Sequence, residues 1–137
     1  MKKVMPIDEE FVYSAKAIIS QTDVSGKIIY ANKAFCEASG YSAQELLGKT
    51  YKIIRHPDMP KIVFEKLWHS VSDGQVWNGL IKNLRSDGRY YWDDLSILPI
   101  KDDEAKIISF ISVARQASKK NIQENESLYE KMLTTQI

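Results

Sequence analysis

The chain has 137 residues, of which 44% are hydrophobic and 27% are charged, which is the size and composition of one globular domain. Its 19 basic and 18 acidic residues leave a formal net charge of +1, which does not favour the strongly basic proteins that bind nucleic acid or anionic membranes. The single cysteine, Cys36, excludes a disulfide framework and a cysteine-based zinc site, and it fits a reducing, cytoplasmic setting.

The N-terminus predicts neither a signal peptide nor a membrane anchor. The two lysines of 1–6 are followed by acidic residues instead of an apolar segment. No apolar run approaches the ~20 residues of a membrane span, so we expect no direct membrane insertion. Residues 7–14 place Ile7, Phe11 and Val12 at helical spacing and predict a short N-terminal helix.

The first half of the domain predicts a hairpin followed by helices. Two strand patterns, 17–22 and 27–31, flank a turn that ends in Gly26. Asn32 is a typical N-cap for a helix that runs to Ser39.

Further along, Ser42 and Glu45 have the spacing of a capping box and predict a second short helix. Residues 49–60 contain two prolines and are expected to be irregular, and 61–72 have the apolar stripe of an amphipathic helix.

The second half predicts strands over 77–85, 90–100 and 106–114, followed by a polar helix within 117–135. The fold class is therefore α+β, a five-stranded antiparallel sheet with helices on one face, a short N-terminal helix and a C-terminal connector helix. The last strand is apolar on both faces, so we expect the helices of 32–73 on one side of the sheet and the N-terminal helix or a partner on the other.

Three motifs in this order resemble the opening of a PAS domain, a resemblance that covers about residues 16–116. They are Asp23-Val24-Ser25-Gly26-Lys27-Ile28-Ile29-Tyr30-Ala31-Asn32-Lys33-Ala34-Phe35, Ser39-Gly40-Tyr41-Ser42 and Glu45-Leu46-Leu47-Gly48-Lys49. The expected organisation is an N-terminal cap over 1–15, a PAS sensor domain over 16–116 and a helical connector over 117–137.

A second group of motifs resembles the flavin-binding PAS domain of bacterial aerotaxis receptors and related energy-taxis sensors. These motifs are Arg55-His56-Pro57-Asp58-Met59-Pro60, Trp77-Asn78-Gly79, Lys82-Asn83, Asp87-Gly88 and Tyr91-Trp92. The resemblance implies non-covalently bound FAD whose redox state alters contacts with a signalling module. The cofactor-binding residues that it implies are Asn32, Arg55, His56, Asp58, Trp77, Asn83 and Tyr91.

The same resemblance implies the partners. A chemoreceptor signalling module or a HAMP-type segment, in cis or in trans, would receive the signal in chemotaxis, and a second copy of the chain is a further expected partner. We expect a redox sensor of the cytoplasm that does not act on nucleic acid.

Residue chemistry supports part of this site. Trp77, Gly79, Ile81 and Asn83 have the same parity on one strand, so they would offer one face with an aromatic plane, a gap at the glycine, an apolar wall and an amide. The alternative for Trp77 is an ordinary core residue. We hypothesise that the Asn83 amide exchanges hydrogen-bond roles when the flavin is reduced.

The polar residues of the 55–58 loop have alternatives of their own. Arg55 is suited to pair with a pyrophosphate, and His56 to bond or stack on a ring. Asp58 either orients one of these cations or caps the following helix.

Two other functions stay open at this stage. One is a haem-binding gas sensor with His56 or His69 as axial ligand, and the other is a cofactor-free PAS interaction module. Asp93 and Asp94 are neighbours on a strand and face opposite ways, so they form no acid/base pair. Because we find no catalytic constellation, we expect that the chain is not an enzyme.

Overall fold

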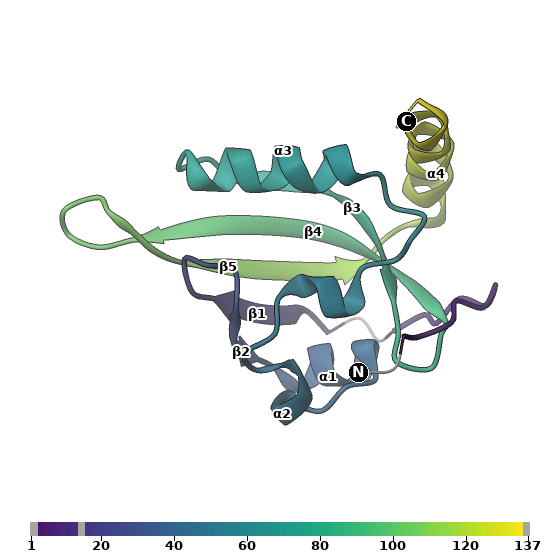
Figure 1. Cartoon of the computed structure of the whole chain (residues 1–137), viewed down its shortest axis with the longest axis horizontal. Coiled ribbons are helices and arrows are strands. Elements are labelled where there is room, and N and C mark those ends of the chain that lie inside the picture. Colours follow the sequence, from purple (N-terminus) through teal and green to yellow (C-terminus); the bar gives the residue numbers. More distant parts are fainter. Residues whose placement is uncertain (1–2, 14–15, 136–137) are drawn as a thin grey trace.

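The computed structural model describes residues 3–13 and 16–135, and Figure 1 shows the arrangement of the elements. Five antiparallel strands form one sheet in the order β2-β1-β5-β4-β3. The strands are β1 (Ile18–Thr22), β2 (Ile28–Ala31), β3 (Trp77–Leu84), β4 (Tyr90–Lys101) and β5 (Ile107–Gln116). The predicted sheet is confirmed, and β1 pairs with β5 as well as with β2, which joins the first hairpin to the last strand.

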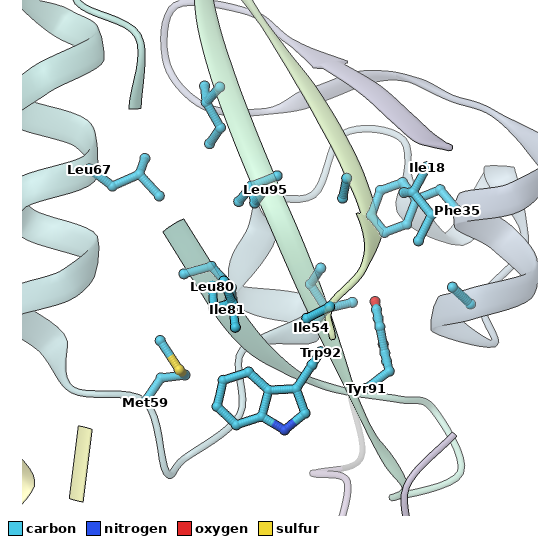
Figure 2. Packing of buried hydrophobic residues seen from close by; sticks show 14 of the residues in the cluster. Ile18, Phe35, Ile54, Met59, Leu67, Leu80, Ile81, Tyr91, Trp92 and Leu95 are labelled. Atoms are coloured by element: carbon cyan, nitrogen blue, oxygen red, sulfur yellow. The ribbon is translucent and has the colours of Figure 1, made fainter. Parts of the chain in front are cut away.

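The helices between β2 and β3 lie beside this sheet. They are α1 (Lys33–Ser39), α2 (Ala43–Leu46), the 3-10 turn η1 (Tyr51–Ile54) and α3 (Lys61–Ser72). In the close-up of Figure 2, Leu67 on α3 points toward Leu95 on β4, and Phe35 on α1 lies beside Ile18 on β1. A large part of the apolar core therefore lies between these helices and one face of the sheet.

The helix caps that the sequence predicts are confirmed. The Asn32 side chain accepts a hydrogen bond from the Phe35 amide, and the Ser42–Glu45 capping box is formed in both directions. Gly40 ends α1 with φ of 78°, a conformation that costs glycine little and other residues more.

The short N-terminal helix predicted over 7–14 is wrong for 7–13, and Ser14 lies outside the described residues. This segment is extended and forms a parallel bridge between Glu10 and Tyr90. The amide of Ile7 donates to the Gly88 carbonyl over 2.9 Å, and that of Phe11 to the Tyr90 carbonyl over 2.7 Å. A helix this short is marginal by itself, so pairing with the β3–β4 hairpin satisfies the same backbone groups better. Figure 1 shows the segment beside the hairpin turn.

The second face of the sheet is covered at one end by α4 (Lys119–Thr134), which Ser118 caps. Tyr129 of this helix stacks on Trp92 with ring centroids 6.4 Å apart, and its hydroxyl donates to the Leu80 carbonyl over 2.6 Å. Figure 2 shows Trp92 and its neighbour Tyr91 pointing to different sides of β4. The C-terminal helix is thus packed on the domain here, and its role as a connector stays a prediction.

Asn32 has a structural task that leads to a first prediction. Its Oδ1 accepts from the amides of Phe35 and Ile19, and its Nδ2 donates to the Ala17 carbonyl. We expect Asn32→Ala to lower the free energy of unfolding by about 2–3 kcal/mol, since a helix cap and two further hydrogen bonds are lost. Urea denaturation measures this, with Asn32→Asp as the control that keeps the acceptor and is expected to lose less. A loss below about 0.5 kcal/mol for Asn32→Ala would contradict the assignment.

Candidate functional site

A cavity of about 50 Å³ lies between the sheet and the helices, and we call it the central cavity. Its apolar wall comes from β1, α1, η1, α3, β3 and β4, and its polar groups come from β1, β3, β4, β5, η1 and the residue after η1. The lining residues are Ile18, Ser20, Phe35, Tyr51, Ile54, Arg55, Phe64, Leu67, Trp68, Ile81, Asn83, Asp93, Leu95, Ile97 and Ser112. A mostly apolar cavity with a few convergent polar groups is typical of a small-molecule site.

Arg55 and Asn83 are the two predicted site residues that line this cavity. A backbone bridge between them holds the loop after η1 against the edge of β3. The Arg55 guanidinium carbon lies 4.1 Å from the centre of the Phe64 ring, and burial lowers the pKa of the guanidinium. Its Nε is buried without a hydrogen-bond partner, so one donor of this cation is available to a ligand.

The other loop residues point elsewhere. His56 is buried, its Nδ1 accepts from the Asp58 amide over 3.0 Å, and its ring lies edge-on to Tyr90. Burial and the nearby Lys82 ammonium lower the pKa of His56. Asp58 is exposed and pairs with the Lys82 ammonium over 3.0 Å, whereas α3 has Pro60 at its N-cap, so the helix-capping alternative for Asp58 is wrong.

Trp77 and Tyr91 share the parity of Asn83 and Asp93 on their strands but are not among the lining residues of the central cavity. The gap expected at Gly79 is filled, because a Cβ at this position would collide with the Trp77 indole. Tyr91 is fully buried, and its hydroxyl lacks a hydrogen-bond partner. The structure does not test whether Trp77, Tyr91 or Asn32, which caps α1, binds a cofactor. Their roles in cofactor binding stay predictions.

Asp93 is the site residue that the sequence analysis missed. Its Oδ1 accepts from the Tyr13 hydroxyl over 2.9 Å and its Oδ2 from Asn83 Nδ2 over 2.9 Å. Burial raises the pKa of Asp93 from 3.8 to about 7, and these two hydrogen bonds offset part of the shift. The signal was available: a carboxyl at an inward position of an apolar strand is expensive to bury and therefore deserves a functional explanation.

Polar and aromatic groups from β1 and η1 complete the wall. The hydroxyls of Ser20 and Tyr51 are hydrogen-bonded at 2.7 Å, and the Tyr51 ring stacks on Trp68 with centroids 6.5 Å apart. Tyr51, Arg55 and Trp68 also line an open groove of about 280 Å³ beside the β1–β2 turn. These three side chains therefore separate the central cavity from the outside.

A larger groove of about 860 Å³ also reaches Arg55, and we call it the basic groove. Four cationic side chains line it, and among its described lining residues there is no carboxylate. The cations are Lys3, Lys49, Lys52 and Arg55. Such a one-signed groove attracts an anionic ligand.

The two histidines and the cysteine lie away from the central cavity. His69 is exposed on α3, and Cys36 is half-buried on α1, where burial raises the pKa of its thiol. Neither Cys36 nor either histidine is among the residues that line the central cavity.

The fold and this site define a PAS domain. Residues 28–114 match the sequence model described as the PAS fold, and the chain belongs to this family. It is 38% identical over 112 residues to the aerotaxis receptor of Escherichia coli (strain K12), a match that covers 82% of this chain. It is 32% identical over 107 residues to the nitrogen fixation regulatory protein of Klebsiella oxytoca, covering 78% of this chain. The match spans 22% of the length of each of these relatives.

Solved structures share the fold. A light-oxygen-voltage domain studied with a flavin analogue superposes with a TM-score of 0.75 at 23% identity, covering 85% of this chain and 89% of that one. A PAS domain from Colwellia psychrerythraea gives a TM-score of 0.68 at 24% identity, covering 75% and 87%. Across residues 3–13 and 16–135, none of the helices combines the length and apolar character needed to cross a membrane.

The raised pKa of Asp93 predicts a pH dependence of stability. The folded protein keeps a proton on Asp93 that the unfolded chain releases above pH ~4, so this group stabilises the fold at acidic pH and its contribution is lost as the pH rises toward 7. We expect the free energy of unfolding, relative to that of Asp93→Asn, to fall by up to about 1.4 kcal/mol per pH unit across this window. Urea denaturation between pH 4.5 and 7.5 measures the difference, and Asp94→Asn, at an exposed position, is the control. A wild-type profile parallel to that of Asp93→Asn would contradict the assignment.

Proposed function

We propose that this PAS domain binds FAD and reports the redox state of the flavin to a signalling partner. The observation that carries the proposal is the position of Arg55, which lines both the apolar central cavity and the basic groove. An FAD molecule has a matching division, because a planar, largely apolar ring lies at one end and a ribityl chain connects it to a charged pyrophosphate. The names of two relatives, an aerotaxis receptor and a nitrogen fixation regulator, support a sensory role.

The residues that line the central cavity suit the chemistry of a flavin, but the volume of the cavity is too small for a flavin ring. Apolar side chains offer two broad walls, and Asn83 and Asp93 offer hydrogen-bonding groups to a ring edge. The volume of about 50 Å³ is well below the roughly 300–1,000 Å³ of typical ligand pockets. Binding therefore requires Tyr51 and Trp68, which separate the cavity from the open groove beside the β1–β2 turn, to move aside.

A bound flavin supplies a ring that takes up and releases electrons. The chain holds that ring between the sheet and α3, and the apolar wall excludes water from it. Arg55 binds the pyrophosphate with charge-assisted hydrogen bonds, and Lys49 and Lys52 contribute further positive charge in the groove. The two lysines also distinguish FAD from a flavin without phosphate.

The partner that we propose is a signalling module of the chemoreceptor type, in the same chain or in a separate one, in the cytoplasm. In this proposal the domain senses and performs no catalysis. The match spans about a fifth of the length of these two relatives, so most of each relative lies outside the part that this chain resembles.

The small volume of the central cavity favours a second candidate, a PAS domain that acts through protein association without a cofactor. The absorption spectrum of the freshly purified protein distinguishes the two. We expect two broad flavin bands and, after heat release and chromatography, FAD in the supernatant. No visible absorption, together with no binding of added FAD, would refute the proposal, and a sharp Soret band would identify haem instead.

If the basic groove binds the pyrophosphate, removing a positive charge from it should weaken the binding of FAD more than that of riboflavin. We expect Arg55→Gln to weaken FAD binding at least tenfold, about 1.5–3 kcal/mol for a lost charge-assisted hydrogen bond, and riboflavin binding much less. Lys52→Gln should have the same selectivity with a smaller effect, since an exposed pair contributes less. Titration monitored by flavin fluorescence measures both ligands, with Lys106→Gln, at an exposed position outside the groove, as control. Equal losses for FAD and riboflavin would contradict a phosphate contact.

A further inference from the structure

The hydrogen bonds of Asp93 connect the central cavity with the N-terminal segment, residues 3–13. This carboxyl is 6% exposed, lines the central cavity, and has two neutral partners that come from different parts of the chain. Asn83 belongs to β3, and Tyr13 belongs to the N-terminal segment. One carboxyl group thus contacts both the place where a ligand would lie and a segment outside the PAS sheet.

The carboxylate determines how the Asn83 amide is oriented. An ionised carboxyl group only accepts hydrogen bonds, so the amide must turn its Nδ2 toward Asp93. The amide oxygen then lies on the side away from Asp93, where it can accept from a ligand, and one Nδ2 proton is still available as a donor. Without this carboxylate, either end of the amide is able to face the ligand.

A proton on Asp93 changes this arrangement on either oxygen. A proton on Oδ2 that points at Asn83 would favour an amide turned with its oxygen toward Asp93 and its NH₂ toward the cavity. A proton on Oδ1 that points at Tyr13 would favour a Tyr13 hydroxyl that accepts instead of donates. Protonation of Asp93 therefore affects either Asn83 at the cavity or Tyr13 in the N-terminal segment.

Tyr13 is the best buried side chain of the N-terminal segment. It is 8% exposed, and its ring packs edge-on against Tyr91 with centroids 6.0 Å apart. In contrast, Met5 and Val12 of the same segment are 74% and 66% exposed. Tyr13 is therefore the most deeply buried contact of residues 3–13, in addition to the backbone hydrogen bonds of Ile7 and Phe11 and the Phe11 ring beneath Arg85 and Arg89.

Among the described residues, the hydrogen-bond partners of Asp93 are neutral, and no cation is among the causes that lower its pKa. Tyr13, Tyr91 and Tyr51 face it from the N-terminal segment, β4 and η1, and the pKa of each is raised by burial and by the Asp93 charge. Arg55 lines the same cavity, and Asp94 points to the opposite face. A buried carboxylate in such surroundings is sensitive to any further change of charge in the cavity.

We propose that Asp93 is a positioning residue that links the central cavity to the N-terminal segment, because its carboxyl orients the Asn83 amide toward a ligand and holds residues 3–13 through Tyr13. A ligand that changes the protonation of Asp93 thereby changes how firmly the segment is held. The proposal depends on the proposed function for the identity of the ligand, whereas the link to residues 3–13 exists in the ligand-free protein.

The direction of the effect follows from solvation. While the segment covers Asp93 the carboxylate is poorly hydrated, and when the segment leaves, water reaches it. The covered state therefore binds the proton more tightly, and release of the segment becomes easier as the pH rises through 7.

Hydrogen exchange of the ligand-free protein tests the link. After correction for intrinsic rates, we expect exchange of the 3–13 peptide to increase at least fivefold between pH 5.5 and 8.5, with a smaller change in the β5 peptide 107–116, which reports global opening. Asp93→Asn should remove this pH step, and Asp94→Asn should keep it. Tyr13→Phe, which retains the ring packing, should make the step larger because the carboxylate loses a hydrogen bond. A step of the same size in Asp93→Asn, or none in the wild type, would overturn the link.

Flavin binding tests the orientation of Asn83 separately. We expect riboflavin affinity to fall at least tenfold in Asp93→Asn and to change less than twofold in Asp94→Asn. Unchanged affinity in Asp93→Asn would overturn the positioning role. Should the wild type bind no flavin, the proposed function fails while the exchange experiment still decides whether Asp93 holds the N-terminal segment.

Discussion

The pairing register of β4 with β3 and β5 is the constraint on which the rest of the structure depends. Within this register Asp93 lies opposite Ile81 on β3 and Gln116 on β5, and its side chain faces the central cavity. The next residue on either side faces away, and Trp92 uses that position to stack on Tyr129. A slip of one residue would exchange the two faces, so that the cavity would lose its carboxyl and α4 its contact.

The same strand explains why the molecule needs its two terminal segments. β4 is buried on both faces around Tyr91–Asp93, and the helices between β2 and β3 cover one of these faces. At the Trp92 end, α4 covers the other face, while the N-terminal segment pairs with the start of β4 and sends Tyr13 into the core. Both segments are thus part of the packed domain, and both lie where a change in the cavity is able to reach them.

The candidate site combines the hydrogen-bonded cluster around Asp93 with the apolar central cavity. In this structure the cavity is closed and too small for a large ring. Tyr51 and Trp68 stack across the entrance and remove from water the apolar surface that a ligand would otherwise cover. A ligand that replaces them exchanges one aromatic contact for another, so the cost of opening is partly recovered. Arg55 lies at the point where the cavity and the basic groove meet, and the two parts of the site depend on its position.

The sequence alone determined those features whose interactions are local. The capping bonds of Asn32 and Ser42, the turn at Gly26 and the amphipathic helix 61–72 involve residues a few positions apart, and strand alternation placed Asn83 on the inner face. The tertiary structure alone decided what depends on distant partners. Residues 7–13 are extended because the β3–β4 hairpin supplies their backbone partners. Asp93 became a site residue because Tyr13, 80 positions away, meets it inside the core. The reason is that periodicity records which face a residue occupies, whereas the partner that it meets there depends on how segments far apart in the chain pack together.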